Sequence, residues 1–212
     1  MNRPLARTAL GIAVFLAGAA VSYRVFLREP CLTWGATDEE ARRAMPGDEL
    51  MPAPDIVATR AIAIDAPAED VWPWLVQMGS GRGGAYTYDW VENLLGLDMR
   101  SADEILPQFQ GLAVGDVLPM GDAGPSLRVE VLDPGRALVL RSEDGAWVWA
   151  FGLHARDGAT RLVSRNRIAL PGASAAKRLA YTLLMEPGSL LMERRMLVGI
   201  RQRAERVRGG RD

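Results

Sequence analysis

The 212-residue sequence predicts an α+β protein in which a curved antiparallel sheet wraps a long C-terminal helix. Three observations predict this class. Residues 60–65 alternate as a strand does and precede two short helical segments. Between residues 126 and 170, further alternating segments are separated by short turn sequences, which favours antiparallel pairing. From residue 174 onward, apolar residues recur at helical spacing.

The composition narrows the classes of function. A hydrophobic fraction of 49% suffices to bury one good core, and a net charge of −1 lacks the basic excess that nucleic-acid binding needs. Cys31 and His154 are the only residues of their types, which excludes a disulfide framework, a cysteine-based zinc site and a histidine cluster. We therefore predict no metal site and no nucleic-acid partner.

Residues 1–28 have the features of a targeting or anchoring segment. Arg3 and Arg7 precede an uncharged run over residues 8–23, as in both secretory signal peptides and membrane anchors. If Arg24 extends to the interface, the run gives roughly 20 residues, enough to cross a ~30 Å hydrocarbon core. We favour a single-pass transmembrane helix and a membrane location, because no clean A-x-A site precedes a polar mature start. The side of the membrane stays open, since arginines flank both ends of the run.

Residues 29–57 form a polar, proline-dotted connector. Thr37 and Glu40 have capping-box spacing, which predicts a short helix over residues 38–45 that ends at Pro46. We expect this connector to pack on the edge of a domain that spans residues 58–207, with residues 208–212 as a tail.

Two short helices follow the first strand. Asp65 is the predicted cap of the first helix and Gly79 its end. The second helix is predicted over residues 90–95. One face of the first helix is apolar, at spacings of three and four residues: Val71, Trp74, Leu75 and Met78.

The sheet and the last helix complete the domain. Turn sequences that begin at Asp133, Glu143 and Asp157 separate the strands of the meander. Ser174 opens the C-terminal helical segment, and Pro187 with the following glycine predicts a break or kink in it. The strands are predicted over residues 60–65, 112–118, 127–131, 137–141, 147–153 and 160–170.

The loop after the first helix is rich in glycine. Gly79, Gly81 and Gly84 match the spacing G-x-G-x-x-G, but a helix precedes them where a dinucleotide site needs a strand. We therefore expect no nucleotide and no other cofactor. Arg82 lies at the centre of the loop, where it faces an anionic group of a ligand, stays solvated, or pairs with a structural acid such as Asp98 or Asp103.

Large aromatic side chains are numerous for a domain of this size. Core packing accounts for some of them, and the others can line an apolar ligand pocket, with methionines that adapt to varied ligands. Tyr86 and Tyr88 combine an apolar ring with a polar tip, which suits a pocket rim. The predicted ligand-binding residues are Trp74, Arg82, Tyr86, Tyr88, Trp90, Trp147, Trp149, Phe151, Met192 and Met196.

The sequence offers no catalytic constellation. His154 is out of phase with Trp149 and Phe151, so we expect it on the outer face of the sheet. An enzyme would need polar acid or base groups that point into the cavity. The candidates for that role are Asp89, Tyr86, Tyr88 and Asn166.

The residues resemble those of the START-like superfamily called SRPBCC, in the run AIDAPAEDVWPWLVQMGSGRGGAYTYDWVENLLGLDMRSADEI and in LAVGDVLPM, LDPGRALVL and WAF. The chain looks most like bacterial membrane-anchored members with a WGAT segment, here residues 34–37, before the domain. The resemblance covers residues 34–206. It implies a helix-grip fold with a deep hydrophobic cavity between the sheet and the C-terminal helix.

Three functions are compatible with these features. The leading expectation is a non-enzymatic protein that binds a hydrophobic small molecule or lipid at the membrane. The superfamily also contains polyketide cyclases/dehydrases, so the resemblance keeps an enzyme of that kind open. A structural or interaction module with a filled core is the third alternative.

Overall fold

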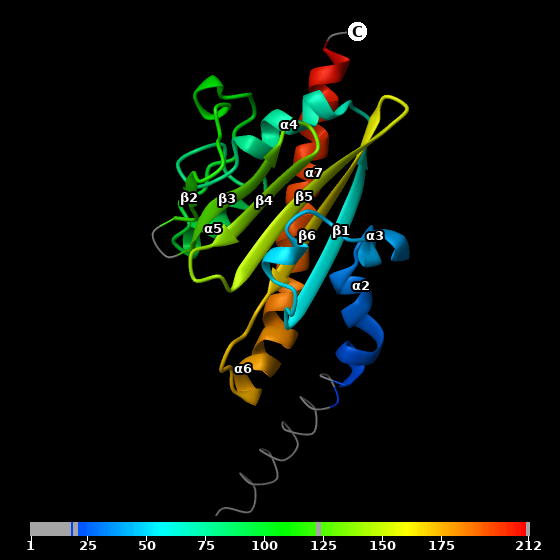
Figure 1. The fold of residues 1–212 in the computed structure, drawn as a ribbon, viewed down its shortest axis with the longest axis vertical. Coiled ribbons are helices and arrows are strands. Elements are labelled where there is room, and N and C mark those ends of the chain that lie inside the picture. The colour runs from blue at the N-terminus through cyan, green and yellow to red at the C-terminus, as the bar shows by residue number, and fades with distance from the viewer. Residues whose placement is uncertain (1–17, 19–20, 122–123, 211–212) are drawn as a thin grey trace, which may run out of the picture.

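The computed structural model describes residues 18, 21–121 and 124–210, and it has the predicted α+β architecture (Figure 1). A six-stranded sheet in the order β1-β6-β5-β4-β3-β2 lies against the long C-terminal helix α7 (Glu186–Gly209). All neighbouring strands are antiparallel. The strands are β1 (Ile56–Ile64), β2 (Val117–Pro119), β3 (Ser126–Asp133), β4 (Ala137–Ser142), β5 (Trp147–Arg156) and β6 (Ala159–Ile168).

The strand order confirms the predicted meander. Consecutive strands from β2 to β6 pair with one another. Strand β1 pairs with β6, with Ile56 opposite Ile168. Each of the three predicted turns contains a glycine at positive φ, namely Gly135, Gly145 and Gly158. A residue with a Cβ is strained in that conformation, so these glycines permit the tight connections between strands.

Helices α4 (Ala68–Val76) and α5 (Asp89–Leu94) follow β1. The predicted apolar face of α4 is confirmed, because all four of its residues are buried. The predicted cap is wrong: Pro67 is the N-cap of α4, and Asp65 lies two residues before it. The Asp65 carboxylate instead accepts a hydrogen bond from Arg208 at 2.6 Å. A single 3-10 turn, η3 (Pro107–Phe109), lies in the segment before β2.

The C-terminal segment is one continuous helical path. It consists of α6 (Ala175–Ala180), a π-helical stretch η4 (Tyr181–Met185), and α7. The break predicted at Pro187 does not occur: Pro187 lies in the first turn of α7, and the chain is helical on both sides of it. The helix adjusts just before it, where Glu186 N–H bonds to Tyr181 O, five residues back.

The N-terminal part of the described chain is helical and attached to α7. It comprises the π-helical stretch η1 (Tyr23–Leu27) and α2 (Arg28–Leu32). Most of the predicted membrane anchor, residues 1–17 and 19–20, lies outside the described residues. Among the helices that are described, none has both the length and the apolar character that crossing a membrane takes.

The connector covers the outer face of the sheet, the face opposite α4 and α7. The capping box at Thr37 and Glu40 is confirmed, although its helix, α3 (Asp38–Arg42), is shorter than predicted. A 3-10 turn, η2 (Asp48–Leu50), follows. Apolar residues of the connector and of the strands form a second core here: Met45, Met51, Ala61, Val139, Val148, Ala150 and Val163.

Arginines of β6 bind the connector to this outer face. Arg161 pairs with Glu40 at 2.8 Å, and Arg165 pairs with Asp48 at 2.7 Å. Arg165 also donates hydrogen bonds to three backbone carbonyls of residues 40–43. The connector therefore packs over the face of the sheet, beyond the edge contact that the sequence predicts.

Candidate functional site

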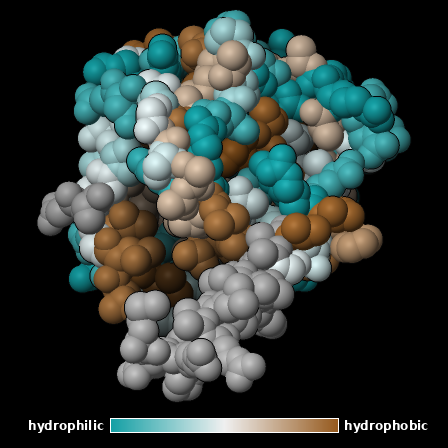
Figure 2. All heavy atoms as spheres, turned by 90° about the horizontal axis from the view of Figure 1, so that it is seen from below, coloured by the Kyte–Doolittle hydropathy of each residue, from teal (hydrophilic) through white to brown (hydrophobic). Residues whose placement is uncertain are grey.

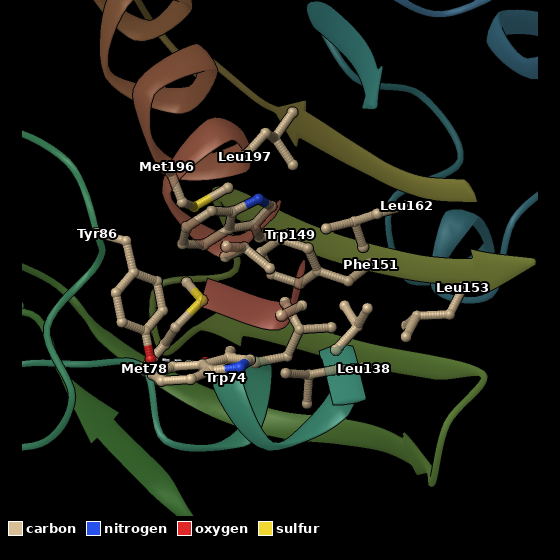
Figure 3. Close-up of a cluster of buried hydrophobic side chains, with 14 of the residues drawn as sticks. Trp74, Met78, Tyr86, Leu138, Trp149, Phe151, Leu153, Leu162, Met196 and Leu197 are labelled. Carbon is tan, nitrogen blue, oxygen red and sulfur yellow. Dashed lines mark hydrogen bonds between the residues drawn. The ribbon is translucent and has the colours of Figure 1, made fainter. Parts of the chain in front are cut away.

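The space between the sheet and α7 is filled by side chains. Trp74, Tyr86, Phe151, Met196 and Leu197 are each no more than 2% exposed. Figure 3 shows them pointing toward one another from α4, the following loop, the strands and α7. The main core contains five of the predicted ligand-binding residues, which all contact other protein side chains there: Trp74, Tyr86, Trp149, Phe151 and Met196.

The aromatic rings of β5 share the inner face of the sheet, as predicted. Trp147 stacks on Trp149 with ring centroids 5.3 Å apart, and Trp149 contacts Phe151 at 4.8 Å. On the other side of the core, Trp74 and Tyr86 meet edge to face at 5.9 Å. Trp147 is the member of this row that is partly exposed.

A polar cluster lies among these rings. Glu193 of α7 forms an ion pair with Arg60 of β1, and both side chains are buried. Ser164 Oγ and Asn166 Nδ2 of β6 donate to Glu193 Oε1 at 2.5 and 3.0 Å. We call Arg60, Ser164, Asn166 and Glu193 the interior polar cluster.

The indole N–H groups extend the cluster toward β5. Trp149 Nε1 donates to Ser164 Oγ at 2.9 Å, and Trp147 Nε1 donates to Asn166 Oδ1 at 2.8 Å. At the other end, Arg60 donates to Cys31 O of α2 and to Ser189 Oγ of α7. The cluster therefore joins β1, β5, β6, α2 and α7 through hydrogen bonds.

Sequence reasoning found only Asn166 of this cluster. A signal was present, because Arg60 is in phase with Ile62 and Ile64, the apolar residues of the predicted first strand. A polar residue at an inward position of a strand is costly to bury unless it is paired, so it marks an internal partner. Ser164 and Asn166 show the same phase along β6.

Arg82 forms its hydrogen bonds with backbone carbonyl groups of neighbouring residues. Its guanidinium donates to Met78 O, Val76 O and Phe109 O at 2.9–3.2 Å, and it lies 4.5 Å from the centre of the Phe109 ring. Burial lowers its pKa. Arg82 thus joins the glycine loop to α4 and η3. Among the described residues it forms no ion pair with Asp98 or Asp103, and Asp103 pairs with Arg203 instead.

The loop between α4 and α5 is tightly folded. Gly79 and Gly84 form an antiparallel bridge, and Tyr86 OH donates to Trp74 O at 2.9 Å. Tyr86 also packs close to α7, where Gly199 has no side chain to obstruct it. Burial raises the pKa of the Tyr86 hydroxyl.

The remaining predicted residues lie apart from the core. Trp90 is 72% exposed because it lies on the outward side of α5. Tyr88 is partly exposed, with the Arg195 guanidinium 5.9 Å from its ring centre, and Met192 is partly exposed on α7. Asp89 accepts hydrogen bonds from Ser101 N and Oγ, which uses both carboxylate oxygens to hold a loop.

Other titratable groups occupy separate places. His154 lies on the outer face as predicted, with its Nε2 2.9 Å from the Arg43 guanidinium. Burial, together with Arg43, lowers its pKa. Burial raises the pKa of Glu92 on α5. No group of His, Cys, Asp and Glu within the described ranges could hold a metal ion.

Two hollows on the described surface lie away from the space between the sheet and α7. One, of about 670 Å³, is lined by polar residues of α7 and by Asp103. The other, of about 550 Å³, lies on the outer face between the connector and the β3–β4 and β5 segments, beside His154. Neither hollow is the deep cavity that the resemblance implies.

Comparison with known proteins shows similarity at low identity. No protein-family model and no curated protein matches the chain. Solved structures that are similar include a polyketide-cyclase-like protein from Corynebacterium glutamicum, at 16% identity over 72% of this chain and 92% of that chain, with a TM-score of 0.38. The protein KanY is similar at 12% identity over 71% and 97%, with a TM-score of 0.46.

The self-sacrificing resistance protein CalC from Micromonospora echinospora is similar at 10% identity over 72% of this chain and 96% of that chain, with a TM-score of 0.45. At these identities and TM-scores, membership of the superfamily that the sequence resembles stays a prediction. Identities this low transfer no site residue, and the membrane-anchored subgroup stays a prediction.

Proposed function

We propose that the protein binds a neutral, largely apolar small molecule or lipid between the inner face of the sheet and α7, and works at a membrane surface. The observation that carries this proposal is the interior polar cluster, which lies among stacked indole rings in an otherwise apolar core. Buried charges are costly in a core that has only to be stable.

The surroundings of the cluster suit an apolar ligand. Trp147, Trp149 and Phe151 present a continuous row of rings along β5. Trp147 and Met192 are partly exposed, so the row reaches the surface at the end where β5 begins. Aromatic faces and a methionine bind varied apolar molecules without demanding one shape.

The cluster suits a neutral polar group on that ligand. Arg60 and Glu193 are paired, so together they offer no net charge to an ion. The Asn166 amide has two N–H groups and two acceptor lone pairs, and the bonds to Glu193 and Trp147 use one of each. A hydroxyl or carbonyl of the ligand can take the remaining capacity.

Binding requires the start of α7 to move away from β5 and β6, because the space is filled in the present conformation. The backbone hydrogen bonding of the helical path is reduced where this motion would occur, because η4 is π-helical and Pro187 has no backbone N–H. Displacement there would open the row of rings from the Trp147 end.

The test is uptake of matched fluorescent probes by the full chain in detergent. We expect a fluorescent long-chain alcohol to bind, and its carboxylate analogue to bind several-fold more weakly. Trp147→Ala and Asn166→Leu should each weaken binding of the alcohol. The matched control is Trp90→Ala, which removes an exposed indole on α5 and should bind like the wild type.

Native mass spectrometry of the same samples adds an independent readout. A co-purifying apolar molecule that is lost in Trp147→Ala supports the proposal. Equal binding by Trp147→Ala and Trp90→Ala contradicts it. An empty protein that takes up neither probe indicates the interaction module with a filled core, which the present packing also fits.

An enzyme on the same site finds less support. Two of the four candidate residues for catalysis have structural roles. Asp89 accepts hydrogen bonds from Ser101, and Tyr86 OH donates to Trp74 O. Tyr88 lies outside the interior polar cluster, and only Asn166 belongs to it. A turnover assay in which Asn166→Leu keeps probe binding and abolishes conversion of a substrate would favour the enzyme.

A further inference from the structure

We infer that the end of the molecule formed by η1, α6 and η4 is a lipid-facing surface, which rests on the membrane as a contact separate from the N-terminal run at residues 8–20. The evidence is a group of large apolar side chains, each at least half exposed, on two segments far apart in sequence. They are Val25, Phe26, Leu27, Leu179, Leu184 and Met185. Figure 2 looks onto this end and shows apolar residues gathered there in patches.

The two segments are held together as one surface. Arg28 pairs with Glu186 at 2.7 Å, and Tyr23 OH donates to the same carboxylate at 3.1 Å. Cys31 Sγ contacts Glu186 O at 3.4 Å. Because Glu186 directly follows η4, these bonds hold the N-terminal helix beside η4, which carries the exposed Leu184 and Met185.

The extent of this surface is unusual for a protein face in water. Single exposed apolar residues are ordinary, but a contiguous group of large ones marks a contact with lipid or protein. Stability of the fold does not require them, since the two segments are already joined through Glu186 and the buried side of α7.

The sequence and the nearby charges identify lipid as the occupant. In the sequence, the uncharged and largely apolar run of residues 8–20 lies just before η1. Arg24 and Lys177 are exposed on the same two segments. Their apolar stems can lie along the acyl boundary while their charges reach phosphate groups.

A second copy of the chain fits this surface less well. In a symmetric dimer the same patch meets itself, which brings Arg24 and Lys177 of one copy toward those of the other. Like charges that face each other at an interface are unfavourable. A bilayer with anionic headgroups has no such conflict.

The experiment measures the depth of one labelled site in a bilayer. The full chain is reconstituted into vesicles of phosphatidylcholine and phosphatidylglycerol, with a fluorophore on Leu184→Cys. The only native thiol, Cys31, is buried and should not be labelled. Spin-labelled lipids then quench a fluorophore that lies at the headgroup or acyl level.

The matched control is a fluorophore on Ala155→Cys, an exposed position near the far end of β5. We expect quenching at position 184 to exceed that at position 155 several-fold, and a second label on Leu179→Cys to behave like position 184. The residues at positions 155, 179 and 184 are all exposed, so each substitution should leave the melting temperature of the protein unchanged.

Equal quenching at positions 184 and 155 would overturn the inference. So would strong energy transfer between donor- and acceptor-labelled copies at position 184 without quenching by lipid, since that result assigns the surface to a second copy. Both outcomes are independent of whether the protein takes up an apolar ligand.

Discussion

Arg60 of β1 and Glu193 of α7 form an ion pair in the interior of the protein, with side chains only 1% and 7% exposed. Each charge has left water, and their mutual attraction together with the bonds to Ser164 and Asn166 offsets that cost. The stability of the contact between the sheet and α7 therefore depends on both Arg60 and Glu193. Removal of the pair should be informative in two different ways.

Glu193→Ala should destabilise the protein by roughly 3–5 kcal/mol, because Arg60 is then buried without its partner. The double substitution Arg60→Met with Glu193→Met should recover most of that loss, since apolar side chains of similar volume carry no desolvation cost. Urea unfolding of the three proteins measures both values. Equal loss in the single and the double variant would show that the charges are not the cause.

Gly199→Ala should destabilise the protein by roughly 1–3 kcal/mol. An added Cβ would lie 2.6 Å from Tyr86 O and 2.8 Å from Tyr86 Cβ, so α7 and the loop would have to separate. Gly188→Ala is the control on the same helix, because its Cβ would meet no atom within 4 Å. That variant should gain up to about 1 kcal/mol from helix propensity, and thermal unfolding of both distinguishes packing from propensity.

The connector should make stability depend on acidic pH. The Arg161 guanidinium lowers the pKa of Glu40 from 4.5 to about 2 in the folded protein. The stabilisation is therefore complete above pH 4.5 and is lost as the pH falls toward 2, with a size of roughly 3 kcal/mol. Glu40→Gln should be less stable at pH 7 and lose less stability on acidification. Parallel pH profiles for the variant and the wild type would contradict this.

Arg82→Ala should destabilise the glycine loop rather than change ligand charge preference. The substitution leaves three carbonyl groups without their donor, which should cost roughly 2 kcal/mol. Arg136→Ala, on an exposed turn, removes the same charge without such bonds and should be nearly neutral. Selective loss of an anionic probe by Arg82→Ala, with unchanged stability, would restore a ligand-binding role for this residue.

Local patterns in the sequence predict most of the fold. The turns at Asp133, Glu143 and Asp157 and the apolar face of α4 appear in the structure where the spacing indicates them. Turn chemistry and periodicity act over a few residues, so they can be recognised without knowledge of the whole chain. Asp65 shows the limit of such rules, because a nearby arginine from α7 binds the residue that seemed suited to cap a helix.

The candidate site depends on partners that are distant in sequence. Glu193 lies 133 residues after Arg60, and only the folded sheet and helix bring them together. The same holds for Arg82, whose role is set by carbonyls of α4 and η3. The inward phase of Arg60 predicts that some partner exists, but its identity follows from the packing of α7 on β1.

Because residues 40–51 cover the outer face of the sheet, we predict that the folding unit includes them. A chain cut at residue 58 would lose only the first two residues of β1 from the sheet, yet it would expose Val139, Val148 and Val163 to water. It would also leave Arg165 without Asp48. A fragment that begins after the predicted connector should therefore aggregate, because its outer sheet face would have no cover.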